Sequence, residues 1–158
     1  MITSLKEYSP NDFVKLTYNS NINNDFQFRE GLNEDIYPLN TREECARGGF
    51  YFCRFKDVLQ WFRRYQDCNL WRVKIPEGEK VIDYGSKLKA RKIYLFNCIK
   101  FYEHPELCKL AASVHPYSLE YVKTKTPLLC QIAYENRPNL IIKNYVKKFF
   151  DIDDFETI

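Results

Sequence analysis

The 158-residue sequence has few histidines and glycines and no long apolar run. It contains two histidines and five glycines, and its six cysteines form no CxxC pair, so neither a structural zinc site nor a glycine-rich phosphate loop is predicted. No segment approaches about 18 consecutive apolar residues, so no transmembrane helix is predicted. The first ten residues lack a hydrophobic segment, and we therefore expect neither a secretory signal nor a disulfide framework.

Aromatic residues are abundant, with 12 Phe, 12 Tyr and 2 Trp in the chain. Together with 45% apolar and 28% charged residues, they are typical of a folded protein of one domain, or of one domain with a small appendage. The 24 basic and 21 acidic residues give a net charge of +3, which is too small to require nucleic acid or an anionic membrane as partner.

The first hundred residues alternate in the manner of β-strands. Two glycines, Gly48 and Gly49, precede an aromatic run, and we expect them to adopt positive φ or to allow close backbone approach. Apolar spacing predicts an amphipathic helix over 55–66. Gly31–Asp35 is expected to break regular structure, and Tyr37–Arg47 to form an irregular loop. The predicted strands are 13–18, 26–28, 50–53, 70–75, 80–84 and 90–96, with 70–75 and 80–84 as a hairpin.

After His104 the apolar period becomes helical, with helices predicted at 107–114, from Thr126–Pro127 onward, and at 140–150. Leu107-Cys108-Lys109-Leu110-Ala111 aligns with Leu129-Cys130-Gln131-Ile132-Ala133, which predicts a short helical repeat. The predicted fold is therefore α+β: a β-rich N-terminal domain (1–100) with one amphipathic helix, and a small C-terminal array of short helices (101–158) packed on it.

Two blocks carry a resemblance to a known family. Gly31-Leu32-Asn33-Glu34-Asp35 with Cys45-Ala46-Arg47-Gly48-Gly49-Phe50-Tyr51-Phe52, and Trp71–Pro76 with Lys87–Ile93, resemble an uncharacterised domain of giant DNA viruses of amoebae. That domain often precedes ankyrin or other repeats. The resemblance covers roughly residues 13–97, and it implies a viral protein in the host cytoplasm or the virion without implying an activity.

The first functional hypothesis is a non-enzymatic interaction or scaffold module that binds a viral or host protein. Exposed aromatic residues would anchor such a partner, and the candidates are Trp61 and Tyr65 on the predicted helix. A half-buried Trp on the flank of the domain is the structural alternative for Trp61.

The second hypothesis is an NAD-binding domain, active or degenerate, because a strand, a loop and a Gly-Phe-Tyr-Phe strand leading into a helix resemble the core of ADP-ribosyltransferases. The resemblance suggests Thr17, Tyr18, Gly49 and Tyr51 as cofactor-binding candidates. The histidine or arginine of that family's first strand is absent, since Lys15-Leu16-Thr17 occupies the region, and no glutamate is suitably placed. We assign no catalytic residue, cofactor or metal.

Three further patterns have both structural and functional interpretations. The lysine-rich stretch Lys87–Lys92 is interpreted as a solvated strand edge rather than a phosphate contact. Aromatic residues interleaved with lysines in Lys92–Phe96 would suit nucleic-acid binding, which the small net charge disfavours. The paired carboxylates 43–44 and 153–154 are interpreted as solvated surface.

Three cysteines are expected to be small buried groups: Cys53, Cys108 and Cys130.

Overall fold

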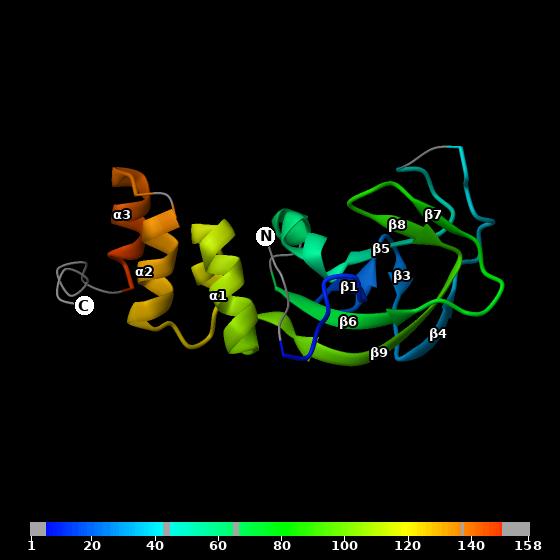
Figure 1. Ribbon diagram of the computed structural model, residues 1–158, viewed down its shortest axis with the longest axis horizontal. Coiled ribbons are helices and arrows are strands. Elements are labelled where there is room, and N and C mark those ends of the chain that lie inside the picture. The colour runs from blue at the N-terminus through cyan, green and yellow to red at the C-terminus, as the bar shows by residue number, and fades with distance from the viewer. Residues whose placement is uncertain (1–5, 43–44, 65–66, 137, 150–158) are drawn as a thin grey trace. The chain divides into compact units, whose positions relative to one another are not determined.

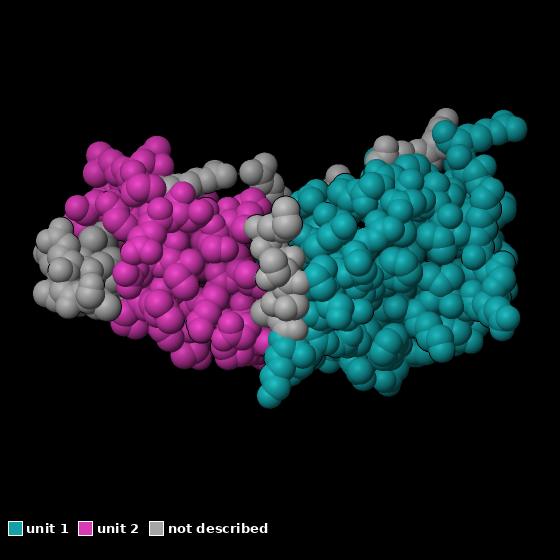
Figure 2. All heavy atoms as spheres, viewed as in Figure 1, with its two compact units in different colours: residues 1–100 teal, residues 101–158 magenta. Residues whose placement is uncertain are grey.

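The computed structural model describes residues 6–42, 45–64, 67–136 and 138–149. The chain divides into two compact units, residues 1–100 and 101–158, which are coloured separately in Figure 2. The first unit carries the sheet and the second is helical, so the predicted α+β class is confirmed.

Unit 1 is built on a seven-stranded antiparallel sheet with the order β4-β9-β6-β1-β5-β8-β7 (Figure 1). The predicted strands 13–18, 50–53 and 70–75 are present at nearly the expected positions. The prediction for 90–96 was less accurate, because the chain turns at Arg91 between two strands. The bounds are β1 (Phe13–Tyr18), β4 (Gly31–Glu34), β5 (Phe50–Arg54), β6 (Cys68–Lys74), β7 (Val81–Asp83), β8 (Leu88–Ala90) and β9 (Lys92–Lys100).

A small hairpin of β2 (Ile22–Asn23) and β3 (Phe26–Gln27) follows β1. Its two turn residues, Asn24 and Asp25, both have positive φ, which matches the tight turn that joins twisted antiparallel strands. A short strand is therefore present near the predicted 26–28, but it ends at Gln27 and its partner is β2. The rings of Phe26 and Phe28 pack against that of Phe50 in tilted and edge-on orientations, with centroids 4.6 and 5.1 Å away, so the hairpin joins the core.

Two predictions about strands were wrong. Gly31–Asp35 was expected to interrupt regular structure, but Gly31–Glu34 forms the edge strand β4 against β9, since cross-strand pairing outweighs the weak strand propensity of Gly and Asn. The segments 70–75 and 80–84 do not form a hairpin: β6 pairs with β1 and β9, while β7 pairs with β8. Local turn residues therefore did not determine the pairing.

The helix predicted over 55–66 is a 3₁₀ helix, η1 (Phe55–Arg64), and not an α-helix. Phe55, Val58 and Leu59 are buried, as their spacing predicted. Positions three residues apart lie on one face in both kinds of helix, so the apolar pattern does not distinguish them.

Unit 2 consists of η2 (Phe101–Glu103), α1 (Pro105–Val114), η3 (Pro116–Tyr121), α2 (Pro127–Asn136) and α3 (Leu140–Val146), so the helix predicted over 140–150 ends early. Thr126 caps α2 as predicted, because its hydroxyl accepts the Leu129 N–H at 3.2 Å. The helices α1 and α2 pack on each other, and the aligned residues Leu107, Cys108, Ala111, Leu129, Cys130 and Ala133 are buried. That they are copies of a repeat stays a prediction. None of the described helices is both long and apolar enough to cross a membrane.

Candidate functional site

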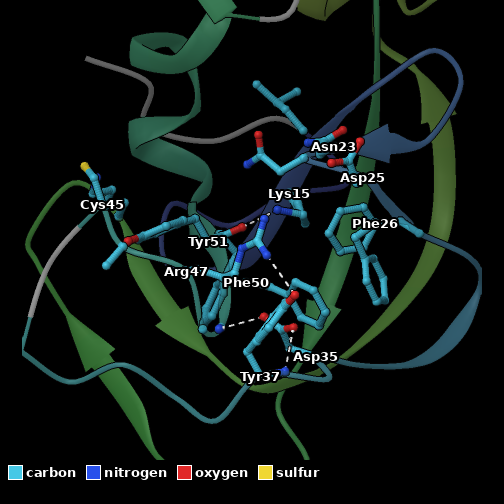
Figure 3. A pocket seen from close by; sticks show the side chains of 18 of the residues that line it. Lys15, Asn23, Asp25, Phe26, Asp35, Tyr37, Cys45, Arg47, Phe50 and Tyr51 are labelled. Atoms are coloured by element: carbon cyan, nitrogen blue, oxygen red, sulfur yellow. Dashed lines mark hydrogen bonds between the residues drawn. The ribbon is translucent and has the colours of Figure 1, made fainter.

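The candidate site lies where the sheet of unit 1 opens between two strands. β1 and β5 pair only through Phe13↔Arg54 and Val14↔Cys53, although both strands continue beyond these pairs. A cavity of about 690 Å³ adjoins the separated parts, and residues of both strands line it (Figure 3). The cavity is thus a consequence of the strand register and not of a local sequence motif.

Lys15 of β1 lies in this wall and is almost fully buried, with 5% of its surface exposed. Its ammonium group donates to the carbonyl oxygen of Tyr51, where backbone pairing between the two strands has ended (Figure 3). The same nitrogen lies 4.7 Å from the centroid of the Phe28 ring. Burial lowers the pKa of Lys15 from 10.5 to about 8, which the nearby Cys53 opposes only in part.

The loop between β4 and β5 forms a second wall of the cavity. Its Arg47 donates to the Tyr37 hydroxyl at 2.7 Å and stacks on the same ring, 4.7 Å from the centroid. Asp35 is buried at the start of the loop and accepts the N–H groups of Tyr37 and Gly49, at 3.1 and 2.8 Å. Both oxygens of this carboxylate therefore hold the loop, which argues against a role for Asp35 as a general base.

Gly48 and Gly49 have the positive φ values that the sequence predicted, +108° and +107°. A Cβ on Gly48 would lie 2.3 Å from the Pro38 carbonyl oxygen, and one on Gly49 would lie 2.8 Å from the Leu39 side chain. Only glycine therefore lets the loop close on itself directly before β5.

The interpretation of Lys87–Lys92 as a solvated strand edge was wrong for two of its lysines. β8 is an inner strand between β5 and β7, and Lys87 and Lys89 are buried. Lys89 donates to the carbonyl oxygens of Asn40 and Ala46, both at 3.2 Å, and so ties the loop to the sheet. Burial lowers the pKa of Lys89, an effect that the Asp35 carboxylate opposes.

Lys87 lines the cavity beside two aromatic rings. Its ammonium lies 4.7 Å from the Tyr51 ring centroid and 5.6 Å from that of Trp61. Trp61 donates its indole N–H to the Ser86 carbonyl oxygen at 3.3 Å and is half-buried. These contacts place Trp61 in the cavity wall instead of on an open surface.

The candidates that the sequence suggested divide into three groups. Gly49 and Tyr51 line the cavity. Thr17 is fully buried outside its lining, where its hydroxyl donates to Asn21 and accepts from the Trp71 indole, and Tyr18 is exposed. Tyr65 lies outside the described residues, as do the paired carboxylates 43–44 and 153–154.

Cavity residues missed by the sequence analysis are Lys15, Asp35 and Arg47. Lys15 lies in β1, whereas Asp35 and Arg47 lie at opposite ends of the loop between β4 and β5, so only the fold brings the three side chains to one cavity. The one available signal was Lys15 itself, a charged residue in a strand that is otherwise apolar or β-branched on both faces.

The cysteines and histidines form no cluster that would hold a metal ion within the described ranges. Cys53, Cys108 and Cys130 are buried, as expected, while Cys45 and Cys98 are exposed. Burial raises the pKa of Cys53 to about 12, so its thiol is neutral at physiological pH.

No family model, curated protein or solved structure matches the chain. The resemblance to the giant-virus domain therefore stays a prediction.

Proposed function

We propose that residues 1–100 form a non-enzymatic binding module for a nucleotide-like ligand, with the cavity between β1 and β5 as its site. The observation that carries the proposal is a cavity whose walls combine cations with aromatic rings. Its volume of about 690 Å³ falls within the range of about 300–1,000 Å³ that small-molecule sites occupy.

The lining suits a ligand that has both a planar ring and a negative charge. Phe26, Phe50 and Tyr37 bring aromatic surface to the cavity, against which a base can pack. Lys15, Arg47 and Lys87 supply positive charge around the same cavity, whereas the acidic residues among its described lining are Asp25 and Asp35. Among the described lining residues the three cations outnumber the two carboxylates, and this balance favours an anionic ligand.

Binding is proposed in preference to catalysis because neither described acidic residue of the cavity is placed to act as a general acid or base. Asp25 is exposed in the hairpin turn, and the oxygens of Asp35 hold the loop. Neither group is arranged as the buried acid or base that a transferase reaction on a nucleotide needs. This retains the nucleotide part of the ADP-ribosyltransferase hypothesis and gives up the activity.

The test is thermal unfolding and calorimetry of the full chain with NAD⁺, ADP-ribose, AMP and nicotinamide mononucleotide. At least one of them is expected to raise the melting temperature in a concentration-dependent manner. A variant tests the site itself: Tyr37→Ala removes one aromatic ring from the wall of the cavity and should weaken the binding of the ligand. If none of the four ligands shifts the unfolding transition at millimolar concentration, the proposed function is wrong.

A second candidate function concerns unit 2, where we propose a protein-interaction surface. Leu140 and Ile141 at the start of α3 are each 70% exposed, and Leu128 at the start of α2 is 49% exposed. Large apolar side chains exposed on short helices favour a protein partner, viral or host. Capture of one defined protein by the wild-type chain, and loss of it with Leu140→Gln and Ile141→Gln, is the expected result.

A further inference from the structure

We propose that the Lys15 ammonium group is the phosphate-binding group of this cavity. The inference rests on the proposed nucleotide-binding function, and it names the residue that distinguishes a nucleotide from the nucleoside that lacks its phosphate. It follows from the position of Lys15 in the strand, its burial and its unfilled hydrogen-bonding capacity.

The position of Lys15 is unusual for a lysine. It is the third residue of β1, next to β6 on one side and to the opening of the sheet on the other. By strand alternation its side chain shares a face with Phe13 and Thr17, and it packs on the Phe28 ring. A charged side chain at such a core position is costly unless a counter-charge compensates it.

The ammonium group has three donors, of which the Tyr51 carbonyl takes one. In the described part of the chain, Lys15 has no ion pair with a carboxylate and no second hydrogen-bond acceptor. Two N–H groups on a buried cation that lines a cavity are therefore left for a ligand. A phosphate oxygen would supply both the acceptor and the missing negative charge.

The other charged or titratable groups around Lys15 do not fill this role. Asp35 is engaged by the loop, and Asp25 is exposed in the hairpin turn. Cys53 of β5 carries a neutral thiol. Arg47 and Lys87 are cations that add to the positive charge of the cavity.

Burial lowers the pKa of the free Lys15 to about 8, and a bound anion would raise it again. Phosphate binding is therefore linked to protonation of this amine. Affinity for a nucleotide should be nearly constant below pH 7.5 and should fall above pH 8, as the amine loses its proton. A nucleoside without phosphate should show no such dependence, since it makes no ionic contact with Lys15.

The experiment compares AMP with adenosine, and nicotinamide mononucleotide with nicotinamide riboside, by calorimetry on the full chain between pH 7 and 9.5. A phosphate monoester has its second pKa near about 6, so the ligand keeps one charge state over this range. The test variant is Lys15→Met, in which an apolar side chain of similar length replaces the lysine. The control variant is Lys56→Met. Lys56 is exposed in η1 and does not line the cavity. Its methionine variant therefore has the same net charge as Lys15→Met but leaves the lining of the cavity unchanged.

For the wild type and Lys56→Met, we expect the phosphorylated ligand to bind at least about tenfold more tightly than its nucleoside at pH 7. That preference should disappear in Lys15→Met, while nucleoside affinity stays within about twofold. The pH dependence is measured on the wild-type protein and needs no variant to fold. A preference retained in Lys15→Met, or a nucleotide affinity unchanged from pH 7 to 9.5, would overturn the assignment while leaving the binding function intact. Absence of binding by all four ligands would instead refute the proposed function, and this inference with it.

Discussion

Two buried lysines of the β1–β5–β8 region differ in how their charge is accommodated. Lys89 is completely buried and has two backbone carbonyls and the field of Asp35 around it. Lys15 has one carbonyl and an aromatic ring. Lys89 is therefore a structural tie, whereas Lys15 retains donors for an external ligand.

The first prediction concerns the pH dependence of stability through Lys15. Its pKa is about 8 in the folded protein and 10.5 when the side chain is fully solvated, so between these values the unfolded chain binds more protons than the folded one. Below pH 8 the buried charge of Lys15 lowers the free energy of unfolding. This destabilisation decreases as the pH rises from 8 toward 10.5. Relative to Lys15→Met, wild-type stability should increase by on the order of 3 kcal/mol over this window.

Urea unfolding of both proteins without ligand, at intervals from pH 7 to 10.5, measures this difference. Other lysines, tyrosines and thiols titrate in both proteins and cancel in the comparison. A stability difference that is independent of pH would show that Lys15 is solvated like a surface lysine.

The second prediction concerns the tie made by Lys89. In Lys89→Met the carbonyls of Asn40 and Ala46 lose their buried donor, so the loop between β4 and β5 should open more often. Trypsin cleavage after Arg42 and Arg47, both exposed, should then accelerate by about tenfold. Lys56→Met is the control and should be cleaved at the wild-type rate. Equal cleavage in both variants would contradict the role given to Lys89.

At the scale of elements, the loop before β5 depends on backbone conformations that a side chain resists. Gly48 and Gly78 both have positive φ, +108° and +81°, but only Gly48 has a close neighbour, the Pro38 carbonyl. Gly78→Ala should therefore cost about 1 kcal/mol of unfolding free energy from backbone strain alone. Gly48→Ala should cost clearly more, because the new Cβ forces the loop apart.

Chemical denaturation of the two alanine variants measures the comparison directly. Both positions have positive φ, and the Gly48 variant adds the contact of its Cβ with the Pro38 carbonyl oxygen. Should Gly48→Ala be no less stable than Gly78→Ala, the loop can shift without loss and is not held by the glycine.

The same elements show what could be predicted from the sequence. Strands β1, β5 and β6 have enough apolar alternation to be located, and Thr126 marks the start of α2 because its capping hydroxyl acts locally. Pairing is non-local. β4 was missed because Gly31 and Asn33 gain their strand conformation from β9, and the hairpin of β6 with β7 was wrong because turn residues do not specify partners.

The cavity was beyond sequence reasoning for the same reason. It exists because the β1–β5 register ends after two pairs, and its charged residues come from β1, the β2–β3 turn, the β4–β5 loop and the residue directly before β8, which only the fold brings together. The burial of Lys87 and Lys89 likewise follows from β8 being an inner strand, which no property of the lysine-rich stretch itself indicates.

At the scale of the whole molecule, the proposed ligand site lies in unit 1. All seven strands of the sheet lie within residues 1–100, and the described residues that line the cavity all lie between Val14 and Lys87. We therefore expect ligand binding to depend on residues of unit 1 alone.

The last prediction is that a chain ending at Lys100 folds and binds. Its sheet keeps every strand pair, and its core keeps the cluster of Phe50, Phe52, Trp71 and Ile93. The truncated chain should unfold cooperatively and should retain the AMP affinity of the full chain within about threefold, since no direct contact with the ligand is removed. Circular dichroism and calorimetry on the two chains make the comparison. A truncated chain that folds but has lost the affinity would show that the site needs residues beyond Lys100, and the assignment of the function to the first unit would be wrong.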